Sequence, residues 1–247
     1  MVAAYGERMA YRSIATLDAA LIECRACPRL VAWREQVARE KRAAFADQTY
    51  WGRPIPGFGP ADASMLILGL APAAHGANRT GRMFTGDQSG DVLYRALYDV
   101  GLANRPTAVS IDDGLELTGV RITAPVHCAP PQNKPTPAER DRCAHWLHNE
   151  IDLLAPTLRS VFVLGAFGWR AALTGFADLG WQVPRPRPTF GHGAQAVIRR
   201  GNRELTLFAS YHVSQHNTFT GRLTPAMLRE VLRAAGHHAG LPVVDGD

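Results

Sequence analysis

Short apolar runs alternate with amphipathic segments along most of the chain, and this alternation is the strongest constraint on its fold. The run Ser64-Met-Leu-Ile-Leu-Gly-Leu70 is continuous, as in a strand buried on both faces, and a helical pattern follows it at about 89–101. Repetition of this order predicts a parallel sheet with helices on both faces. The later elements we expect are strands at 119–126 and 160–164, helices at 137–155 and 166–174, a strand pair at 194–198 and 205–209 that turns at Gly201-Asn202, and a helix from Pro225 to about Ala235.

The chain is expected to form one domain. Its 247 residues, of which 46% are apolar, suffice for a single full core. Within this domain, residues 1–50 show a helical pattern and carry two cysteines near Pro28. The Pro- and Gly-rich stretch 51–63 is expected to be an ordered connecting loop.

The four cysteines of the chain are Cys24, Cys27, Cys128 and Cys143. A close pair followed by two distant cysteines supplies the four thiolates that a [4Fe-4S] cluster or a tetrahedral zinc ion needs. Disulfides are the alternative, and we disfavour them because residues 1 to 20 lack the pattern of a secretory signal. Zinc ribbons usually contain two short pairs, so the fourteen residues between the last two cysteines favour iron and sulfur.

The charge balance is basic. The formal net charge is +5, and nearly all of the basic residues are arginine, since lysine occurs only at Lys41 and Lys134. A basic chain suits a polyanionic partner, although a general bias toward arginine would give the same count without a binding surface. No apolar run reaches the roughly eighteen residues of a membrane-spanning helix, so we expect a soluble, cytoplasmic protein.

Polar or Gly/Pro-rich segments follow each predicted strand. They begin at Ala71, Cys128, Gly165 and Tyr211. In an open α/β sheet such segments meet at the carboxyl ends of the strands, where ligands bind. The first strand is not followed by a Walker motif or by G-x-G-x-x-G, which argues against a nucleotide cofactor.

Two of these segments resemble signature motifs of the family 5 uracil-DNA glycosylases. They are Gly69-Leu-Ala-Pro-Ala-Ala-His-Gly-Ala-Asn-Arg-Thr-Gly-Arg-Met-Phe-Thr-Gly-Asp87 and His212-Val-Ser-Gln-His-Asn-Thr-Phe-Thr-Gly-Arg-Leu223, and the four cysteines match that family's [4Fe-4S] ligands. The resemblance covers nearly the whole chain. It implies a three-layer α/β/α sandwich with a four-stranded parallel sheet, a [4Fe-4S] cluster, and release of damaged bases from DNA. We expect the cluster to be structural and to tie the N-terminal helices to the second motif region, because nothing in the sequence supplies an electron partner.

Cleavage of the bond between deoxyribose and uracil leaves a cationic sugar and an anionic base, so the site must stabilise two opposite charges. The resemblance assigns Asp87 to the sugar cation or the attacking water, although an Asp at this place is also a common helix N-cap. His212 is the best of the nine histidines to donate a hydrogen bond, as a neutral imidazole, to the departing base; a structural loop histidine is the alternative. Asn217, five residues later, is expected to help place sugar, phosphate or water.

Three further residues are expected to bind the base. The Asn133 amide can both donate to and accept from uracil, although an Asn between prolines is usually only a turn residue. Phe84 would stack on the flipped base, whereas most phenylalanines are core residues. Ala71, with Leu70, stands where other branches of the superfamily carry an acidic or amide side chain. The gap would enlarge the pocket, and the resemblance accordingly implies that hypoxanthine and ethenocytosine are accepted besides uracil.

The loop 214–223 is the candidate for the wedge that fills the gap left by the flipped base, with DNA contacts from His216 and Arg222. Phe219 and Leu223 are its apolar side chains. We expect Arg79 and Arg82 to neutralise phosphates, with a solvated basic face as the alternative.

The sequence therefore predicts a monofunctional glycosylase that acts as a monomer on damaged DNA, either double-stranded or single-stranded. Neither motif contains a lysine that could form a Schiff base, which argues against lyase activity. One alternative is a superfamily relative that traps uracil-DNA covalently through a histidine, although the basic loop ending in histidine is not found after the first motif. Another is a non-catalytic iron-sulfur protein that binds nucleic acid or senses redox state.

Overall fold

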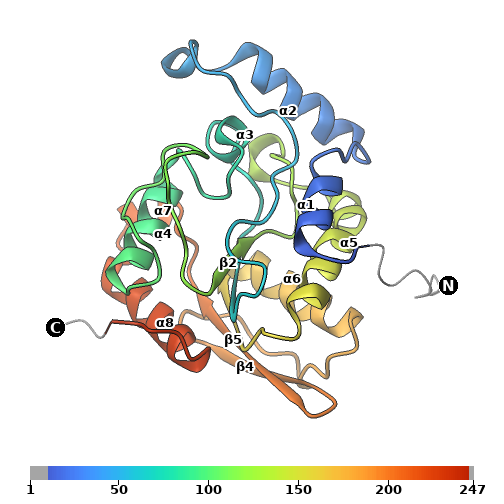
Figure 1. Cartoon of the computed structure of the whole chain (residues 1–247), viewed down its shortest axis with the longest axis vertical. Helices are drawn as coiled ribbons and strands as arrows, with labels where there is room; N and C mark the ends of the chain where they lie inside the picture. Colours follow the sequence, from blue (N-terminus) through green and yellow to red (C-terminus); the bar gives the residue numbers. More distant parts are fainter. Residues whose placement is uncertain (1–10, 245–247) are drawn as a thin grey trace.

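A mixed five-stranded sheet forms the centre of the computed structural model, which describes residues 11–244 (Figure 1). The strand order is β2-β1-β3-β5-β4. The first four of these run parallel, and β4 pairs antiparallel with β5 at the edge. The strands are β1 (Met65–Leu68), β2 (Val120–Thr123), β3 (Ser160–Leu164), β4 (Gln195–Arg200) and β5 (Arg203–Ser210).

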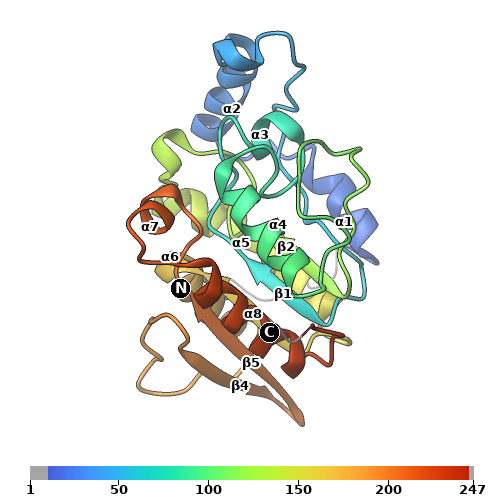
Figure 2. The same cartoon turned by 90° about the vertical axis from the view of Figure 1, so that its left-hand side faces the viewer.

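Helices cover both faces of the sheet (Figures 1 and 2). Side chains alternate along β1, so that Leu66 and Leu68 join the core beneath one layer while Met65 and Ile67 join the other. The first layer contains α1 (Ile14–Leu21), α5 (Pro137–Leu154) and α6 (Gly165–Asp178), with one end of α2 (Pro28–Glu40). The second contains α3 (Ala77–Thr80), α4 (Gln88–Asp99) and α8 (Pro225–His238). The remaining short elements are η1 (Ala43–Phe45), η2 (Pro131–Asn133) and α7 (Gln215–Phe219).

The predicted three-layer arrangement and its four parallel strands are confirmed, and the hairpin partner β4 adds a fifth strand to the sheet. This strand is antiparallel because only a tight turn at Gly201, where φ is +61°, separates it from β5. The predicted N-terminal helical segment consists of α1, α2 and η1, and its first ten residues lie outside the described part of the chain.

The carboxyl ends of the parallel strands lie level with one another. Leu68 of β1 pairs with Thr123 of β2 and with Val163 of β3. Val163 in turn pairs with Ala209 of β5. The segments that leave these strands therefore start from one edge of the sheet, where β1 and β3 form the switch point of the strand order.

Within residues 11–244, no helix combines the length and apolar character required to cross a membrane.

Candidate functional site

A pocket of about 330 Å³ lies at the carboxyl ends of the strands. Of the predicted site residues, it brings together Asp87, His212, Phe84, Asn133 and Ala71 from four separate segments. The rest of its wall is formed by Leu70, Pro72, Ala73, Met83, Ser89, Ala124 and Ser214. The topology thus places one carboxylate, one imidazole, one amide and one aromatic ring around a space large enough for a nucleobase.

Asp87 stands at the amino end of α4 and faces the pocket as well. Its Oδ1 accepts a hydrogen bond of 3.0 Å from the backbone N–H of Gly90, so the predicted N-cap is present. A Cβ on Gly76 would lie 2.1 Å from Asp87 Oδ2, so only glycine leaves room for this carboxylate. Burial raises the pKa of Asp87 above that of an ordinary aspartate, although the backbone N–H groups of α4 oppose the shift.

His212 follows β5 and carries a neutral ring at pH 7. Burial lowers the pKa of its imidazole to about 4. Its ring centroid lies 6.3 Å from that of Phe84, across the pocket. Asn217 is not among the pocket-lining residues. Its side-chain Nδ2 instead donates a 2.8 Å hydrogen bond to the backbone O of His212, which fixes the backbone of that histidine.

Two pocket residues adopt a left-handed backbone conformation that non-glycine residues rarely use. Phe84 has a φ of +52° and Asn133 a φ of +56°, and Gln132, next to Asn133, has +55°. Such positions each cost about 1–3 kcal/mol and occur where the surrounding structure enforces them. The Phe84 ring lies against Gly69 at the end of β1, where an added Cβ would come within 2.8 Å of the ring.

A larger groove of about 1010 Å³ adjoins the pocket. The two share Asp87, Asn133 and Ser214, among others, so the pocket opens from the groove. His216, a predicted DNA contact, lines this groove. Arg222, the other predicted contact, is exposed, and its guanidinium carbon lies 4.7 Å from the ring centroid of Tyr211.

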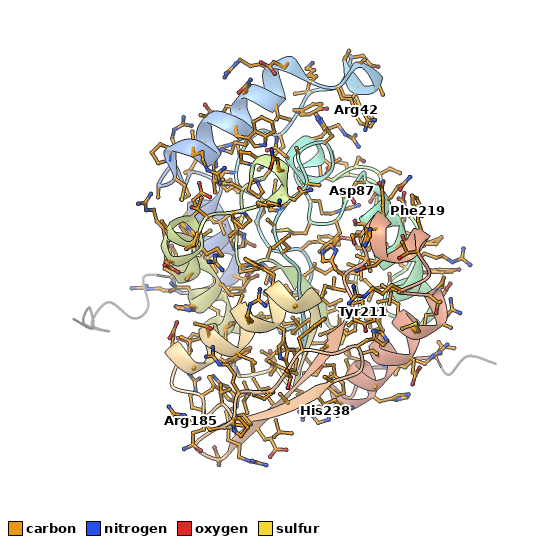
Figure 3. All side chains as sticks on the ribbon, turned by 180° about the vertical axis from the view of Figure 1, so that it is seen from behind. Arg42, Asp87, Arg185, Tyr211, Phe219 and His238 are labelled. Carbon is orange, nitrogen blue, oxygen red and sulfur yellow. The ribbon has the colours of Figure 1, made fainter. Side chains whose placement is uncertain are left out.

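Three expectations about DNA contacts are wrong. Arg82 is buried and bonds through two nitrogens to both carboxylate oxygens of Asp113, so it cannot reach a phosphate. Arg79 is also buried, and its guanidinium donates to three oxygens within the protein. Leu223 is 2% exposed within the core beneath α8, because the chain turns inward after α7. The exposed apolar side chain of this loop is Phe219, at 75% (Figure 3).

The four cysteines line a separate pocket, which is small and mostly apolar. All four are free thiols. Burial raises the pKa of Cys128 to about 11 and also raises that of Cys143. Arg34 of α2, itself 2% exposed, donates from Nη1 to the Sγ of Cys128 at 2.9 Å. Four sulfur donors with a cationic donor beside them fit a group that binds thiolates. Within the described residues, no three His, Cys, Asp or Glu side chains form a set that could hold a single metal ion.

Several groove-lining residues were not anticipated from the sequence. They include Trp33, Arg42 and His75. His75 lies inside the first motif, so its position near the site could have been expected from that segment. Trp33 and Arg42 belong to the N-terminal segment, where the hydrophobic pattern shows a helix but not the surface on which it docks.

Comparison with known proteins finds relatives along nearly the whole chain. Residues 56–236 match the family model described as the Uracil DNA glycosylase superfamily. A type-5 uracil-DNA glycosylase from Mycobacterium tuberculosis is 55% identical over 93% of this chain and 83% of its own length. Its counterpart from Thermus thermophilus is 50% identical over 90% of this chain and 96% of its own. The type-5 uracil-DNA glycosylase from Pyrobaculum aerophilum is 46% identical over 89% of this chain and 91% of its own length.

Proposed function

We infer from the membership of this chain in the type-5 uracil-DNA glycosylases, within the uracil DNA glycosylase superfamily, that the pocket at the strand ends holds a flipped base. The protein is a uracil-DNA glycosylase, a hydrolase of N-glycosyl bonds that acts in DNA repair. The meeting of Asp87, His212, Phe84 and Asn133 around one pocket carries the proposal about how it does so.

Asp87 would stabilise the positive charge that develops on the sugar as the glycosidic bond breaks. The bond from the Gly90 N–H occupies Oδ1, and Oδ2 faces Gly76. A carboxylate held in this way needs little reorganisation when charge develops in front of it. In the same position it can orient the water that attacks the sugar. Leu70 and Ala71 contribute no acidic side chain, so Asp87 is the carboxylate that lines the pocket.

His212 would donate a hydrogen bond to the uracil oxygen on which negative charge collects. Because its pKa is near 4, the ring is neutral at pH 7 and has one N–H to donate. The donor need not lose its proton for the base to leave. Asn217 is a positioning residue in this scheme, since it holds the backbone carbonyl of His212.

Asn133 and Phe84 would recognise the base itself. The amide of Asn133 can pair with an edge that presents both a donor and an acceptor, and the ring of Phe84 can stack on any flat base. Ala71 leaves space beside them. We therefore propose that hypoxanthine and ethenocytosine enter this pocket as well as uracil.

A [4Fe-4S] cluster held by Cys24, Cys27, Cys128 and Cys143 completes the proposal. Its iron atoms would bind the four thiolates and so link segments that lie far apart in the chain. These cysteines come from the turn before α2, the loop after β2, and α5. Arg34 would offset the negative charge of the thiolates from α2. In this proposal the cluster holds α2 in place and takes no part in base release.

DNA, either double-stranded or single-stranded, would lie over the same end of the sheet, and a monomer suffices. Phe219, exposed at the end of α7, would enter the base stack where the damaged nucleotide leaves it. His216 and Arg222 stand on either side of it in the chain and would contact the backbone. We expect this protein to act in the compartment that holds the chromosome.

The test is base release from labelled duplexes that carry a single U·G or hypoxanthine pair, with protein purified without oxygen and products quantified after alkaline cleavage. Release of both bases would support the broad pocket. Release of uracil alone would restrict the pocket to that base. Tight, salt-sensitive binding with no release from either duplex would contradict the proposed roles of Asp87 and His212.

A further inference from the structure

We propose that the groove beside the base pocket is a second DNA subsite, in which Arg42 of the N-terminal segment holds a backbone phosphate of the damaged strand close to the flipped nucleotide. This inference rests on the proposed function of the pocket. It adds a part of the chain, residues 33–48, that neither signature motif includes.

The groove is continuous with the pocket, and this continuity identifies its occupant. A nucleotide that enters the pocket stays attached to its strand, so the neighbouring phosphates must lie at the pocket's mouth. Asp87, Asn133 and Ser214 line both spaces and thus form that mouth. The damaged strand, rather than its complement, is therefore the strand that must pass through the groove.

The groove is lined by segments far apart in the chain. Trp33, Arg42 and Phe45 come from α2, η1 and the link between them, and His216 comes from α7. Figure 3 shows Arg42, Asp87 and Phe219 toward the same end of the molecule. Two carboxylates, Asp87 and Asp91, come from the α4 side of the groove. This distribution suits a strand whose sugar faces α4 and whose phosphate faces Arg42.

Arg42 is the cation of this groove that remains available. In residues 11–244 no carboxylate forms an ion pair with it, and its side chain is exposed. Arg79 also lines the groove, but its guanidinium donates hydrogen bonds to oxygens within the protein. Arg42 and His75 line the groove together. The charge of Arg42 contributes, after burial, to the lowered pKa of His75.

Hydrogen bonds hold the backbone of Arg42 in place. Its backbone N–H donates to the hydroxyl of Tyr50 at 3.3 Å, and the same hydroxyl bonds to Nδ1 of His75 at 3.1 Å. Next to Tyr50, the Trp51 N–H donates to the carbonyl of Arg79. These contacts attach the N-terminal segment to the first motif. A cation carried by a backbone held in this way loses less entropy on binding than one on a mobile loop.

The experiment compares Arg42→Ala, Arg42→Lys and Arg185→Ala with the wild-type protein. Arg185 is a matched control, an exposed arginine at the opposite end of the molecule (Figure 3). Affinity is measured for a duplex with an uncleavable abasic-site analogue, over a series of salt concentrations. One lost phosphate contact lowers the slope of log affinity against log salt by about 0.9. We expect this change for Arg42→Ala, with affinity about three- to tenfold weaker at moderate salt, and near wild-type values for the other two variants.

The phosphate itself is identified by replacing single phosphates with neutral methylphosphonates. One replacement in the damaged strand, near the lesion, should weaken wild-type binding and have no further effect on Arg42→Ala. If instead a methylphosphonate in the opposite strand weakened wild-type binding and had no further effect on Arg42→Ala, the damaged strand would not be the one in the groove. An unchanged affinity and salt slope for Arg42→Ala would overturn the subsite. Single-turnover release of uracil at saturating enzyme should persist in Arg42→Ala, whereas a wild-type protein without release would reject the proposed function instead.

Discussion

At the scale of single residues, the carboxylate of Asp87 has two duties that can be separated. It caps α4 through the Gly90 N–H, and it faces the base pocket. An asparagine at this position retains an oxygen that can accept the capping bond but removes the negative charge. An alanine removes both. The two variants therefore distinguish a structural aspartate from one that acts on the substrate.

We expect Asp87→Asn to lower the single-turnover rate of uracil release by about a hundredfold or more, because a buried charge opposite the sugar cation is lost. Thermal stability should remain close to that of the wild type. Asp87→Ala should show the same loss of rate. Its free energy of unfolding should also fall by about 1 kcal/mol, because the helix cap is removed. Equal stability losses in both variants, with the rate retained in Asp87→Asn, would leave Asp87 with a capping role only.

His212 provides a test through pH. Its pKa in the folded protein is about 4, below the value of 6.5 for an unperturbed histidine. Between these two pH values the unfolded chain binds a proton that the folded protein does not. The free energy of unfolding therefore falls as the pH drops from about 6.5 to 4, and this contribution is fully present only above about 6.5.

His212→Gln removes this titration. Urea denaturation at pH 7 and at pH 5 should show that the wild type loses about 1 to 2 kcal/mol more than the variant over this interval, because only the wild type binds the extra proton on unfolding. The comparison isolates His212 from the other histidines with lowered pKa, since they are present in both proteins. An identical pH dependence would mean that His212 titrates normally in the folded state.

At the scale of elements, the loops that follow the strands could be located from the sequence, but their conformations could not. The positive φ angles of Phe84 and Gln132 occur at residue types for which local preference predicts otherwise. They arise from packing that the chain makes only when folded, such as the Phe84 carbonyl against Gly90, where an added Cβ would lie 1.7 Å away. Sequence motifs therefore located segments that line the pocket, while tertiary contacts determined its geometry.

The segment after β5 shows the same limit. The motif predicted both Phe219 and Leu223 at the DNA surface, but α7 ends at Phe219 and the chain then returns to the core. Nothing in the hydrophobic pattern distinguishes these two apolar residues before the turn is known. Their exposure, 75% against 2%, places Phe219 at the surface and Leu223 in the core.

These roles can be tested with two alanine variants. Phe219→Ala should slow uracil release from U·A pairs more than from single-stranded DNA, since only a duplex leaves a gap to fill. Its stability should not change. Leu223→Ala should instead lower the free energy of unfolding by about 2–5 kcal/mol, as core truncations do. Melting curves and release rates on the two substrates provide both readouts. A Phe219→Ala protein that slows equally on both substrates would not be explained by a wedge.

At the scale of the whole molecule, the parallel strands and the helices on both faces of the sheet were predictable, because each element is encoded by a pattern within one segment. Apolar runs marked the four parallel strands, and the turn at Gly201 marked the added one. Docking of the N-terminal segment was not encoded in this way. It depends on contacts between distant residues, such as Arg34 with Cys128 and Asp18 with Arg121, and these place Trp33 and Arg42 beside the pocket.

The cysteines connect this docking to the proposed cofactor. Cys24 and Cys27 precede α2, whereas Cys128 and Cys143 belong to the body of the sheet domain. Four thiolates bound to one cluster would join these parts, as a structural metal joins segments that pack weakly alone. Removal of the cluster should therefore affect α2 and the groove wall before it affects the base pocket, which α2 does not line.

Protein purified without oxygen should contain iron and acid-labile sulfide in equal amounts, and Cys128→Ser should lose both. We expect this variant to melt at a lower temperature and to bind abasic-site DNA less tightly, because Trp33 and Arg42 lose their support from α2. Its single-turnover rate at saturating enzyme should fall much less than its affinity, since Asp87 and His212 belong to other segments. Stoichiometric zinc without iron would reject the cluster. A rate that collapses while the affinity is retained would place the cluster's role at the base pocket instead of the groove.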